Sequence, residues 1–349
     1  MDLLLATIVS VATLELGDHR AEIIVVTKDA GLDGDSLARQ VSEHAGCNVK
    51  YNEIIDAGEV AMETDADASA LRTLSVVKMS PTVTISALRN RGAHVSSGDY
   101  LAFLDADVQL SRNWLSKMRL TLAQEPARVI VSAVQINPPQ PTPLERVRVA
   151  MVSLSADTKQ KFLSGRNLFL ERKTFDRVGG FPEHLTTCED YWFTHKANQF
   201  GELYCSSAAN FVHLGEDRRY LEMIRKEIWR GQSNLHSVNG RHISLRESAS
   251  FIVPLWVLLA IVALIPATIL VGGMGFAILL GVALLPVALY SLRLLIGSSQ
   301  KLSISAVVGF YLLYFPARGL GMLMGVAKTV VATAKRRASS YSRIDKQES

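Results

Sequence analysis

The stretch GDYLAFLDADV, residues 98–108, carries the clearest structural signal in the chain. Residues 100–104 form a short apolar run, with the length and composition of a strand that is buried on both faces. Two carboxylates, Asp105 and Asp107, follow at the point where this strand opens into a loop. Ligands of α/β sheets bind beyond the carboxyl ends of the strands, so we expect this pair to face a binding site.

Strand-like and helix-like segments alternate on both sides of this stretch. The apolar, β-branched runs predict strands over residues 21–27, 48–55 and 129–134. The spacing of apolar residues predicts helices over 36–45, 88–95 and 112–125. This alternation predicts an α/β fold with a mainly parallel sheet flanked by helices. The segment 56–81 gives no clear assignment, and the proline-rich segment 138–143 is expected to be extended.

The composition of the chain excludes several classes of protein. Among 349 residues, 37 are basic and 33 are acidic, which is too even a balance for a nucleic-acid-binding chain. Three scattered cysteines, Cys47, Cys188 and Cys205, exclude a disulfide-stapled domain. A hydrophobic content of 48% excludes disorder. The mean hydropathy of +0.19 indicates a membrane part.

That membrane part lies near the C-terminus. No charged residue occurs from Ser248 to Leu292, and the run is long enough for two crossings, at about 251–271 and 274–296. A third apolar run, at about 304–327, contains Pro316 and Arg318 and either spans the membrane or lies in its interface. Basic residues flank the hairpin and follow the last run. Because such residues stay on the cytoplasmic side, they favour two crossings.

These features predict three parts of the chain. The N-terminus has an acid at Asp2 and no basic region, so it does not resemble a signal peptide. We therefore expect a cytoplasmic globular domain over 1–240, a membrane domain over 241–330 and a basic tail over 331–349. The expected location is the inner (plasma) membrane, as a multi-pass protein with the globular domain in the cytoplasm.

The paired acids after the 100–104 strand suit a divalent cation. Mg²⁺ and Mn²⁺ prefer oxygen ligands and often use one or two carboxylates together with substrate phosphates. A bare Asp-x-Asp is common by chance, and an exposed acidic turn is its ordinary alternative. The same tripeptide at Asp65–Asp67 follows no apolar strand, and we assign that copy to an exposed loop.

A series of motifs in fixed order resembles the family 2 glycosyltransferases. The motifs are NRGA (90–93), SGDYLAFLDADV (97–108), GRNLFL (165–170), VGGF (178–181) and EDYWF (189–193). The resemblance covers roughly residues 21–213. It implies a nucleotide-diphospho-sugar transferase fold of the GT-A type, with Asp-x-Asp at a strand end. That family usually has a strand and a helix before the strand matched at 21–27, so its first strand is expected to be missing or rebuilt here.

The resemblance also assigns roles to individual residues. It implies that Asp105 holds the nucleotide or a metal, and that Asp107 binds a divalent cation, Mg²⁺ or Mn²⁺, on the diphosphate. It implies that Asp190 is the catalytic base, with Glu189 beside it. His213 matches a third metal ligand of some related enzymes, or is a histidine that only hydrogen-bonds within the fold. The remaining matches imply nucleotide contacts from Asp29, Asn90, Arg91 and Asn167.

One further segment bears on the kind of transferase. Residues 218–230 form an amphipathic pattern that predicts a helix at an anionic membrane surface, or else a solvated charged helix. The QxxRW motif of processive members is absent from this region, where the chain reads IWRGQ (228–232). This difference argues against polymer extrusion.

The expected function is therefore that of a membrane-anchored enzyme, an inverting and non-processive glycosyltransferase. It would move a sugar from a nucleotide sugar to a lipid-linked or glycan acceptor at the cytoplasmic membrane face, in the synthesis of an envelope polysaccharide. One alternative is a polyprenyl-phosphate glycosyl synthase, whose acceptor is already anionic. Another is a non-catalytic membrane scaffold subunit of a polysaccharide-assembly complex.

Overall fold

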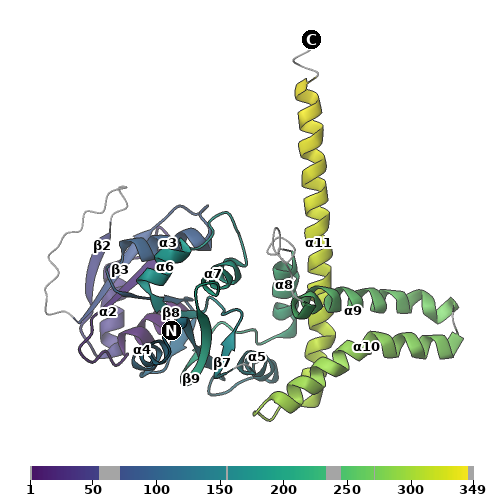
Figure 1. Ribbon diagram of the computed structural model, residues 1–349, viewed down its shortest axis with the longest axis horizontal. Coiled ribbons are helices and arrows are strands. Elements are labelled where there is room, and N and C mark those ends of the chain that lie inside the picture. The colour runs from purple at the N-terminus through teal and green to yellow at the C-terminus, as the bar shows by residue number, and fades with distance from the viewer. Residues whose placement is uncertain (1, 55–70, 155, 233–244, 271, 345–349) are drawn as a thin grey trace. The chain divides into compact units, whose positions relative to one another are not determined.

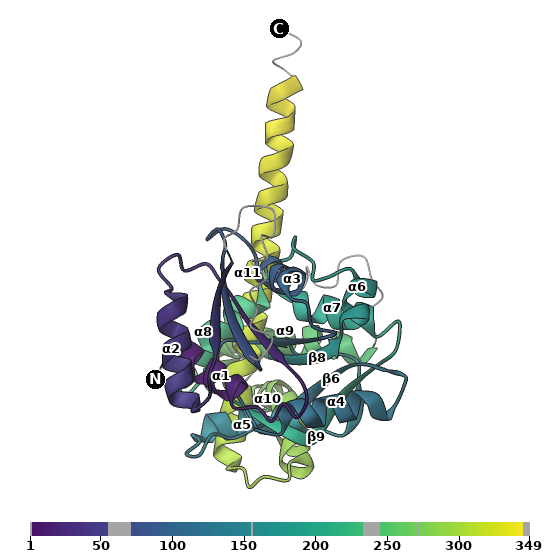
Figure 2. The same cartoon turned by 90° about the vertical axis from the view of Figure 1, so that its left-hand side faces the viewer.

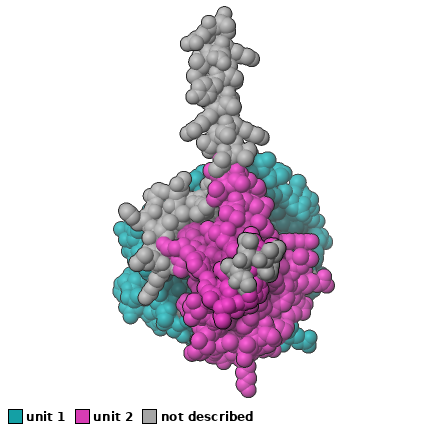
Figure 3. Space-filling model, turned by 90° about the vertical axis from the view of Figure 1, so that its right-hand side faces the viewer, with its two compact units in different colours: residues 1–140, 152–216 teal, residues 141–151, 217–349 magenta. Residues whose placement is uncertain are grey.

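The structure, a computed structural model, describes the chain except for residues 1, 55–70, 155, 233–244, 271 and 345–349 (Figure 1). The acidic tripeptide at Asp65–Asp67 and the domain boundary expected at residue 240 lie outside the described residues. The chain divides into two compact units, coloured separately in Figure 3. The sheet unit comprises residues 1–140 and 152–216, and the helical unit comprises 141–151 and 217–349.

A parallel three-stranded sheet begins the sheet unit. Its strands are β1 (Ala21–Thr27), β2 (Lys50–Ile54) and β3 (Arg72–Lys78), in the order β1-β3-β2. Helices α1 (Leu3–Ala12) and α2 (Gly34–Ala45) lie side by side and pack on it (Figure 2). Leu5, Ile8, Leu37 and Val41 share a buried cluster with this sheet. Strand β3 falls inside the segment that the sequence left unassigned.

A second sheet is mixed. Strands β6 and β9 pair in parallel, whereas the pairs β4–β8, β6–β8, β5–β9 and β7–β9 are antiparallel. The strand order is β4-β8-β6-β9-β5, with β7 also on β9. The strands are β4 (Tyr100–Leu104), β5 (Val108–Leu110), β6 (Arg128–Ile136), β7 (Thr158–Gln160), β8 (Asn167–Glu171) and β9 (Glu202–His213).

Among the described elements, α4 (Trp114–Gln124), α6 (Arg172–Val178) and α7 (Glu189–Ala197) pack on this second sheet, whereas α3 (Ile85–Val95) contacts β1. Trp114, Met118 and Leu122 recur every four residues on one face of α4, which is buried in a core shared with β5, β6, β8 and β9. The rings of Phe181 and Phe193 stack at 4.1 Å between centroids, and both contact Phe103 of β4. This aromatic cluster fixes the start of α7 relative to the end of β4.

The helical unit contains α5 (Pro143–Ser153), α8 (Tyr220–Gly231), α9 (Leu245–Leu270), α10 (Gly272–Gly297) and α11 (Ile304–Ile344). Three stretches are long and apolar enough to cross a membrane: Ser248–Ala267, Gly273–Gly297 and Ile304–Thr329. They coincide with the three predicted apolar helices. Helices α5 and α8 were expected in the first domain, but they group with the long helices, because Arg148 of α5 pairs with Glu227 of α8 in a buried cluster.

Candidate functional site

One guanidinium joins the end of β4 to the start of α7. Arg89 of α3 donates hydrogen bonds from Nη2 to Oδ1 of Asp105 and from Nη1 to Oε1 of Glu189, both at 2.9 Å. The Asp105 amide donates to the Arg166 carbonyl at 3.1 Å, which fixes the loop after β4 beside β8. Three segments that are distant in sequence therefore meet at one point.

Asp190 lies beside this pair and is held by backbone amides. Its Oδ2 accepts a hydrogen bond from the Gly165 amide at 3.0 Å, and its Oδ1 accepts one from the Tyr191 amide at 2.7 Å. A Cβ at position 165 would come within 2.8 Å of Arg89 Nη2, so a glycine there lets the Arg89 guanidinium lie against this part of the backbone. Asp190 is half-buried, and its carboxylate has a defined orientation.

Glu189, by contrast, is buried and turned toward Arg89. Burial raises the pKa of Glu189, and the neighbouring charge of Asp190 raises it further, while the Arg89 charge opposes both effects. Of the two acids predicted for catalysis, Asp190 is therefore the more accessible one. Glu189 is placed to hold Arg89 rather than to meet a substrate.

A second cluster surrounds Asp107. Nε2 of His213 lies 3.1 Å from Oδ2 of Asp107, and Nδ1 of the same ring lies 3.1 Å from Oε2 of Glu216. The pairing of β5 with β9 places Val108 opposite His213, which brings the ring next to Asp107. Burial by itself lowers the pKa of His213, but the hydrogen bonds with Asp107 and Glu216 outweigh it, and the pKa is raised.

This second cluster provides only part of the set of ligands that a divalent cation needs. Across the residues that the structure describes, no group of three or more His, Cys, Asp or Glu side chains is arranged to hold a metal ion. Asp107 and His213 supply one carboxylate and one imidazole, and Glu216 occupies the other ring nitrogen, an arrangement often seen behind metal-binding histidines. The protein thus offers two ligands for a cation, and phosphate oxygens would have to supply the rest of the coordination shell.

Two of the predicted nucleotide contacts have packing roles in the structure. Asn167 is fully buried, and its Oδ1 accepts a hydrogen bond from the Trp114 indole at 3.0 Å. Asn90 holds the Gly-Gly-Phe turn, because its side chain both accepts from the Phe181 amide at 2.7 Å and donates to the Phe181 carbonyl at 2.9 Å. Both side chains are thus engaged within the fold, and a nucleotide contact from either one stays a prediction.

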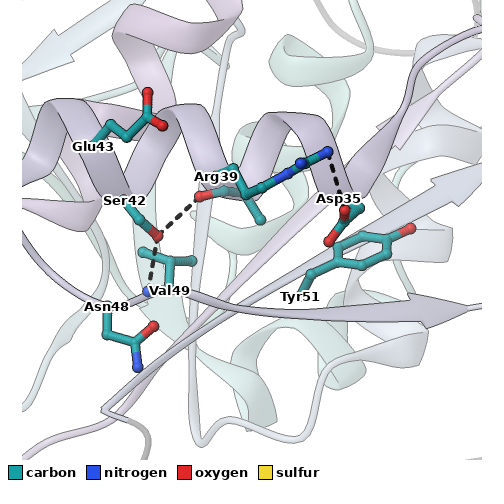
Figure 4. Close-up of a pocket in the computed structure, with 8 residues that line it drawn as sticks. Asp35, Arg39, Ser42, Glu43, Asn48, Val49 and Tyr51 are labelled. Atoms are coloured by element: carbon teal, nitrogen blue, oxygen red, sulfur yellow. Dashed lines mark hydrogen bonds and ion pairs between the residues drawn. The ribbon is translucent and has the colours of Figure 1, made fainter.

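The other two predicted nucleotide contacts lie outside both acidic clusters. Asp29 follows β1 and accepts a hydrogen bond from the Gly31 amide at 2.9 Å. It lines a shallow hollow together with residues of α1 and α2. Arg91 is half-buried on α3. A neighbouring hollow between α2 and β2, which includes Asp35, Arg39 and Tyr51, contains none of the predicted site residues (Figure 4).

Several residues of the site were not identified from the sequence. Arg89 lies directly before NRGA, but nothing in the sequence indicated that it would contact both acids. Glu216 is buried three residues after His213 and also accepts a hydrogen bond from Gln135 Nε2 at 3.2 Å. Arg166 donates to Gln135 Oε1 at 2.8 Å and so extends the same network. In the sequence, the three-residue spacing between His213 and Glu216 was the one signal that these side chains could pair.

Comparisons with known proteins give a family match for part of the chain. Residues 55–182 match the family described as Glycosyl transferase family 2. Glycosyltransferase AglE of Haloferax volcanii is 28% identical over 175 residues, 49% of this chain and 57% of that protein. The match therefore spans little more than half the length of this relative.

One solved structure supports the fold. Mannosyltransferase PcManGT from Pyrobaculum calidifontis, solved in complex with GDP-Man and Mn²⁺, superposes with a TM-score of 0.63 at 17% identity. The superposition covers 93% of this chain and 83% of that one. Residues 1–349 of TarS from S. aureus give a TM-score of only 0.43 at 10% identity, covering 92% and 86% of the two chains. Residues 55–182 therefore match a family 2 glycosyltransferase domain, and the chain has a GT-A-like fold followed by apolar helices that fit a membrane anchor.

Proposed function

We propose that the protein transfers a single sugar from a nucleotide sugar to a lipid-linked or glycan acceptor, with inversion and without processive polymerisation. One observation carries the proposal: Arg89 joins Asp105, the first acid of the donor motif, to Glu189, which stands next to the predicted base. Donor-side and acceptor-side acids thus meet at one point. Transfer requires this meeting, because the attacking hydroxyl must reach the sugar carbon in line with its leaving group.

On the donor side, Asp107 and His213 would hold Mg²⁺ or Mn²⁺, which neutralises charge on the departing diphosphate. The Pyrobaculum neighbour, solved with GDP-Man and Mn²⁺, supports this part of the proposal. Glu216 fixes the imidazole ring of His213, so that Nε2 faces Asp107. Asp29 and Arg91 remain proposed contacts for the nucleotide, at positions separate from the two acidic clusters.

On the acceptor side, Asp190 would take the proton from the attacking hydroxyl. Two backbone amides hold its carboxylate in place, and its partial exposure leaves access for a substrate. A single base is enough for an inverting displacement, because the leaving diphosphate departs without being protonated. Glu189 and Arg89 would keep this base aligned with the donor.

We further propose that the transfer occurs at the cytoplasmic face of the plasma membrane, in the synthesis of an envelope polysaccharide. The apolar helices support membrane attachment, and the basic residues Arg293, in α10, and Lys301, in the segment after it, support the cytoplasmic side. Confinement to a membrane raises the effective concentration of a lipid-linked acceptor.

A panel of nucleotide sugars tests the proposal with the purified full-length chain in lipid nanodiscs. Release of nucleoside diphosphate from one donor, dependent on Mn²⁺ or Mg²⁺ and removed by a chelator, is the expected result. Thermal unfolding with each nucleoside diphosphate and metal gives a second readout. If no nucleotide raises the melting temperature and none is turned over, the scaffold alternative replaces this proposal.

A further inference from the structure

Helix α11 contacts the α9–α10 hairpin at the open end of the hairpin. Tyr290, near the end of α10, packs against Tyr311 and Phe315 of α11 with ring centroids 5.7 and 5.2 Å apart. Helix α11 also contacts α9, the other helix of the hairpin. A Cβ added to Gly319 of α11 would lie 2.5 Å from the carbonyl oxygen of Pro254, near the start of α9. A helix that crossed a bilayer beside this hairpin would be expected to contact it along its length.

The rest of the hairpin extends beyond α11. Leu270 follows Pro254 by 16 residues, which corresponds to about 24 Å of helix, most of the roughly 30 Å of a hydrocarbon core. Its outer apolar residues are open, with Ile265 72% and Met274 78% exposed. Figures 1 and 2 both show α11 running across the hairpin rather than alongside it.

A buried charge cluster fastens α11 to α8. Arg318, in the middle of the apolar stretch of α11, donates to Oε2 of Glu227 at 2.8 Å. Glu227 is 1% exposed and also accepts from Arg148 at 3.1 Å and Arg230 at 2.7 Å. The two helices approach closely nearby, since a Cβ on Gly321 would lie 2.2 Å from the Ile228 carbonyl.

This attachment is incompatible with a crossing by α11. If Ile304–Thr329 spanned a bilayer, Arg318 would lie near its centre, and α8 would follow with Glu227, Arg225 and Lys226. Each charge placed there costs several kcal/mol on the scales that measure it. The burial of the three stretches points the same way, since 44% of the apolar window of α11 is buried in protein, against 11% for α9 and 17% for α10.

We propose that α11 lies along the membrane surface, that α9 and α10 alone enter the bilayer, and that both ends of the chain remain on one side. The partner of α11 is the interface of a phospholipid bilayer. Leu313, Leu320 and Met324 are exposed and, at spacings of seven and four residues, share one face of the helix. This face would rest at the boundary between headgroups and acyl chains. The inference does not depend on sugar transfer.

Depth measurements on the full-length chain in phospholipid vesicles test this placement. Cys47 and Cys188 are replaced by Ser, while Cys205 stays, because burial raises its pKa to about 11. A fluorophore is then attached at Leu313→Cys, Leu320→Cys, Met324→Cys or Ala327→Cys, which are exposed on one face of the helix, and quenched by lipids brominated at different depths. We expect all four labels to lie at the same shallow depth, and a label at Val262→Cys in α9 to lie deep.

A crossing helix gives a different pattern of quenching. Leu313 and Leu320 would then be quenched best by bromines near the ends of the acyl chains, with Ala327 shallow, and that result overturns the proposal. A second measurement requires no cysteine. Epitope tags before Met1 and after Ser349 should be accessible from the same side of sealed vesicles. Tags on opposite sides contradict the placement of α11, whatever the outcome of the transfer assays.

Discussion

Asp105 and Glu189 stand 84 positions apart in the chain, yet they accept hydrogen bonds of equal length, 2.9 Å, from one guanidinium. Arg89, the donor, has 13% of its side chain exposed and Glu189 has 11%, so this half of the link is largely shielded from water, while Asp105 keeps 38% of its side chain exposed. A shielded charge pair is stronger than an exposed one and holds its partners in a fixed geometry. The end of β4 and the start of α7 are therefore coupled directly, without a bound ligand.

Replacing Arg89 with Lys tests this coupling. An ammonium group cannot form the two-pronged contact of a planar guanidinium, so Asp105 and Glu189 lose their common partner. Because misplacement of reacting groups by about 1 Å can cost 10²-fold, we expect kcat of Arg89→Lys to fall by about that factor. The measurement is steady-state release of nucleoside diphosphate. Arg39→Lys, at an exposed position on α2, is the control and should keep most of its turnover. Equal rates for wild type and Arg89→Lys would refute the coupling.

Asp190→Asn tests the identity of the base and the class of acceptor together. If the acceptor is a hydroxyl, removal of the base should lower kcat by about 10²-fold or more. A phosphate acceptor is already ionised and needs no base, so substantial activity would remain and would favour a polyprenyl-phosphate glycosyl synthase. Glu222→Gln, an exposed acid on α8, serves as control. Assays of Asp190→Asn with a polyprenyl phosphate and with a glycan acceptor separate the two outcomes.

Asp107→Asn and Gly215→Ala probe the proposed cation site in different ways. The first removes a carboxylate ligand. The second leaves Asp107 in place but would put a Cβ 2.1 Å from its Oδ2, so the carboxylate must move away from His213. We expect both variants to bind a nucleoside diphosphate with Mn²⁺ at least tenfold more weakly by calorimetry, a loss of about 1.4 kcal/mol.

Two control variants accompany that experiment. Asp176→Asn removes an exposed carboxylate on α6, and Gly281→Ala adds a methyl group where no atom lies within 4 Å. Both should bind as wild type does. Unchanged Mn²⁺-dependent binding by Asp107→Asn would assign the cation, if there is one, to other residues.

The parts of the site that could be predicted from sequence are those encoded locally. An apolar run followed by Asp105 and Asp107 indicates a strand and its loop, because both features depend on neighbouring residues. Arg89 and Glu216 could not be identified in this way, since their roles arise from contacts between distant segments. Motif matching also gives no side-chain direction, and in β8 the side chain of Asn167 points into the core.

In the fold, too, locally encoded features were predicted, and features that depend on contacts between distant segments were missed. The predicted strands at 21–27, 48–55 and 129–134 correspond to β1, β2 and β6, of which β1 and β6 are rich in apolar and β-branched residues while β2 has only Tyr51 and Ile54. Strand β3 was missed because Arg72, Thr73, Ser75 and Lys78 dilute its apolar residues, although it lies between β1 and β2 and pairs with both. The antiparallel pairing of β4 with β8 was also unforeseen, because alternation of elements along the chain does not fix strand direction within the sheet.

Asn167→Ala distinguishes a packing role from nucleotide binding. The substitution leaves the buried Trp114 indole without its acceptor, which costs about 1–3 kcal/mol. We therefore expect a lower melting temperature together with an unchanged KM for the nucleotide sugar in the folded enzyme. Asn48→Ala, at an exposed position, should alter neither quantity. A raised KM without loss of stability would support the role that the motif implied.

Glu227→Gln tests the charge cluster that joins α5, α8 and α11. Arg148, Arg230 and Arg318 all point at this carboxylate, and removing the charge leaves three guanidiniums without a common counter-ion. Loss of one partner from a buried ionic cluster typically costs about 3–5 kcal/mol. The expected result is a marked fall in the melting temperature at pH 7, measured in nanodiscs. Glu222→Gln, on the exposed side of the same helix, should change it little.

The effect of Glu227→Gln should also depend on pH, with a sign that the structure fixes. Burial alone would raise the pKa of Glu227, but the charges of Arg318, Arg148 and Arg230 outweigh it, so the folded-state pKa lies below the usual 4.5. The ionised carboxylate therefore stabilises the fold fully above about pH 4.5, and this stabilisation disappears as the pH falls through the lower, folded-state value. The difference in melting temperature between wild type and Glu227→Gln should accordingly be constant from pH 8 to about pH 5 and shrink below that. A difference that instead grows on acidification would show that Glu227 is protonated in the native cluster.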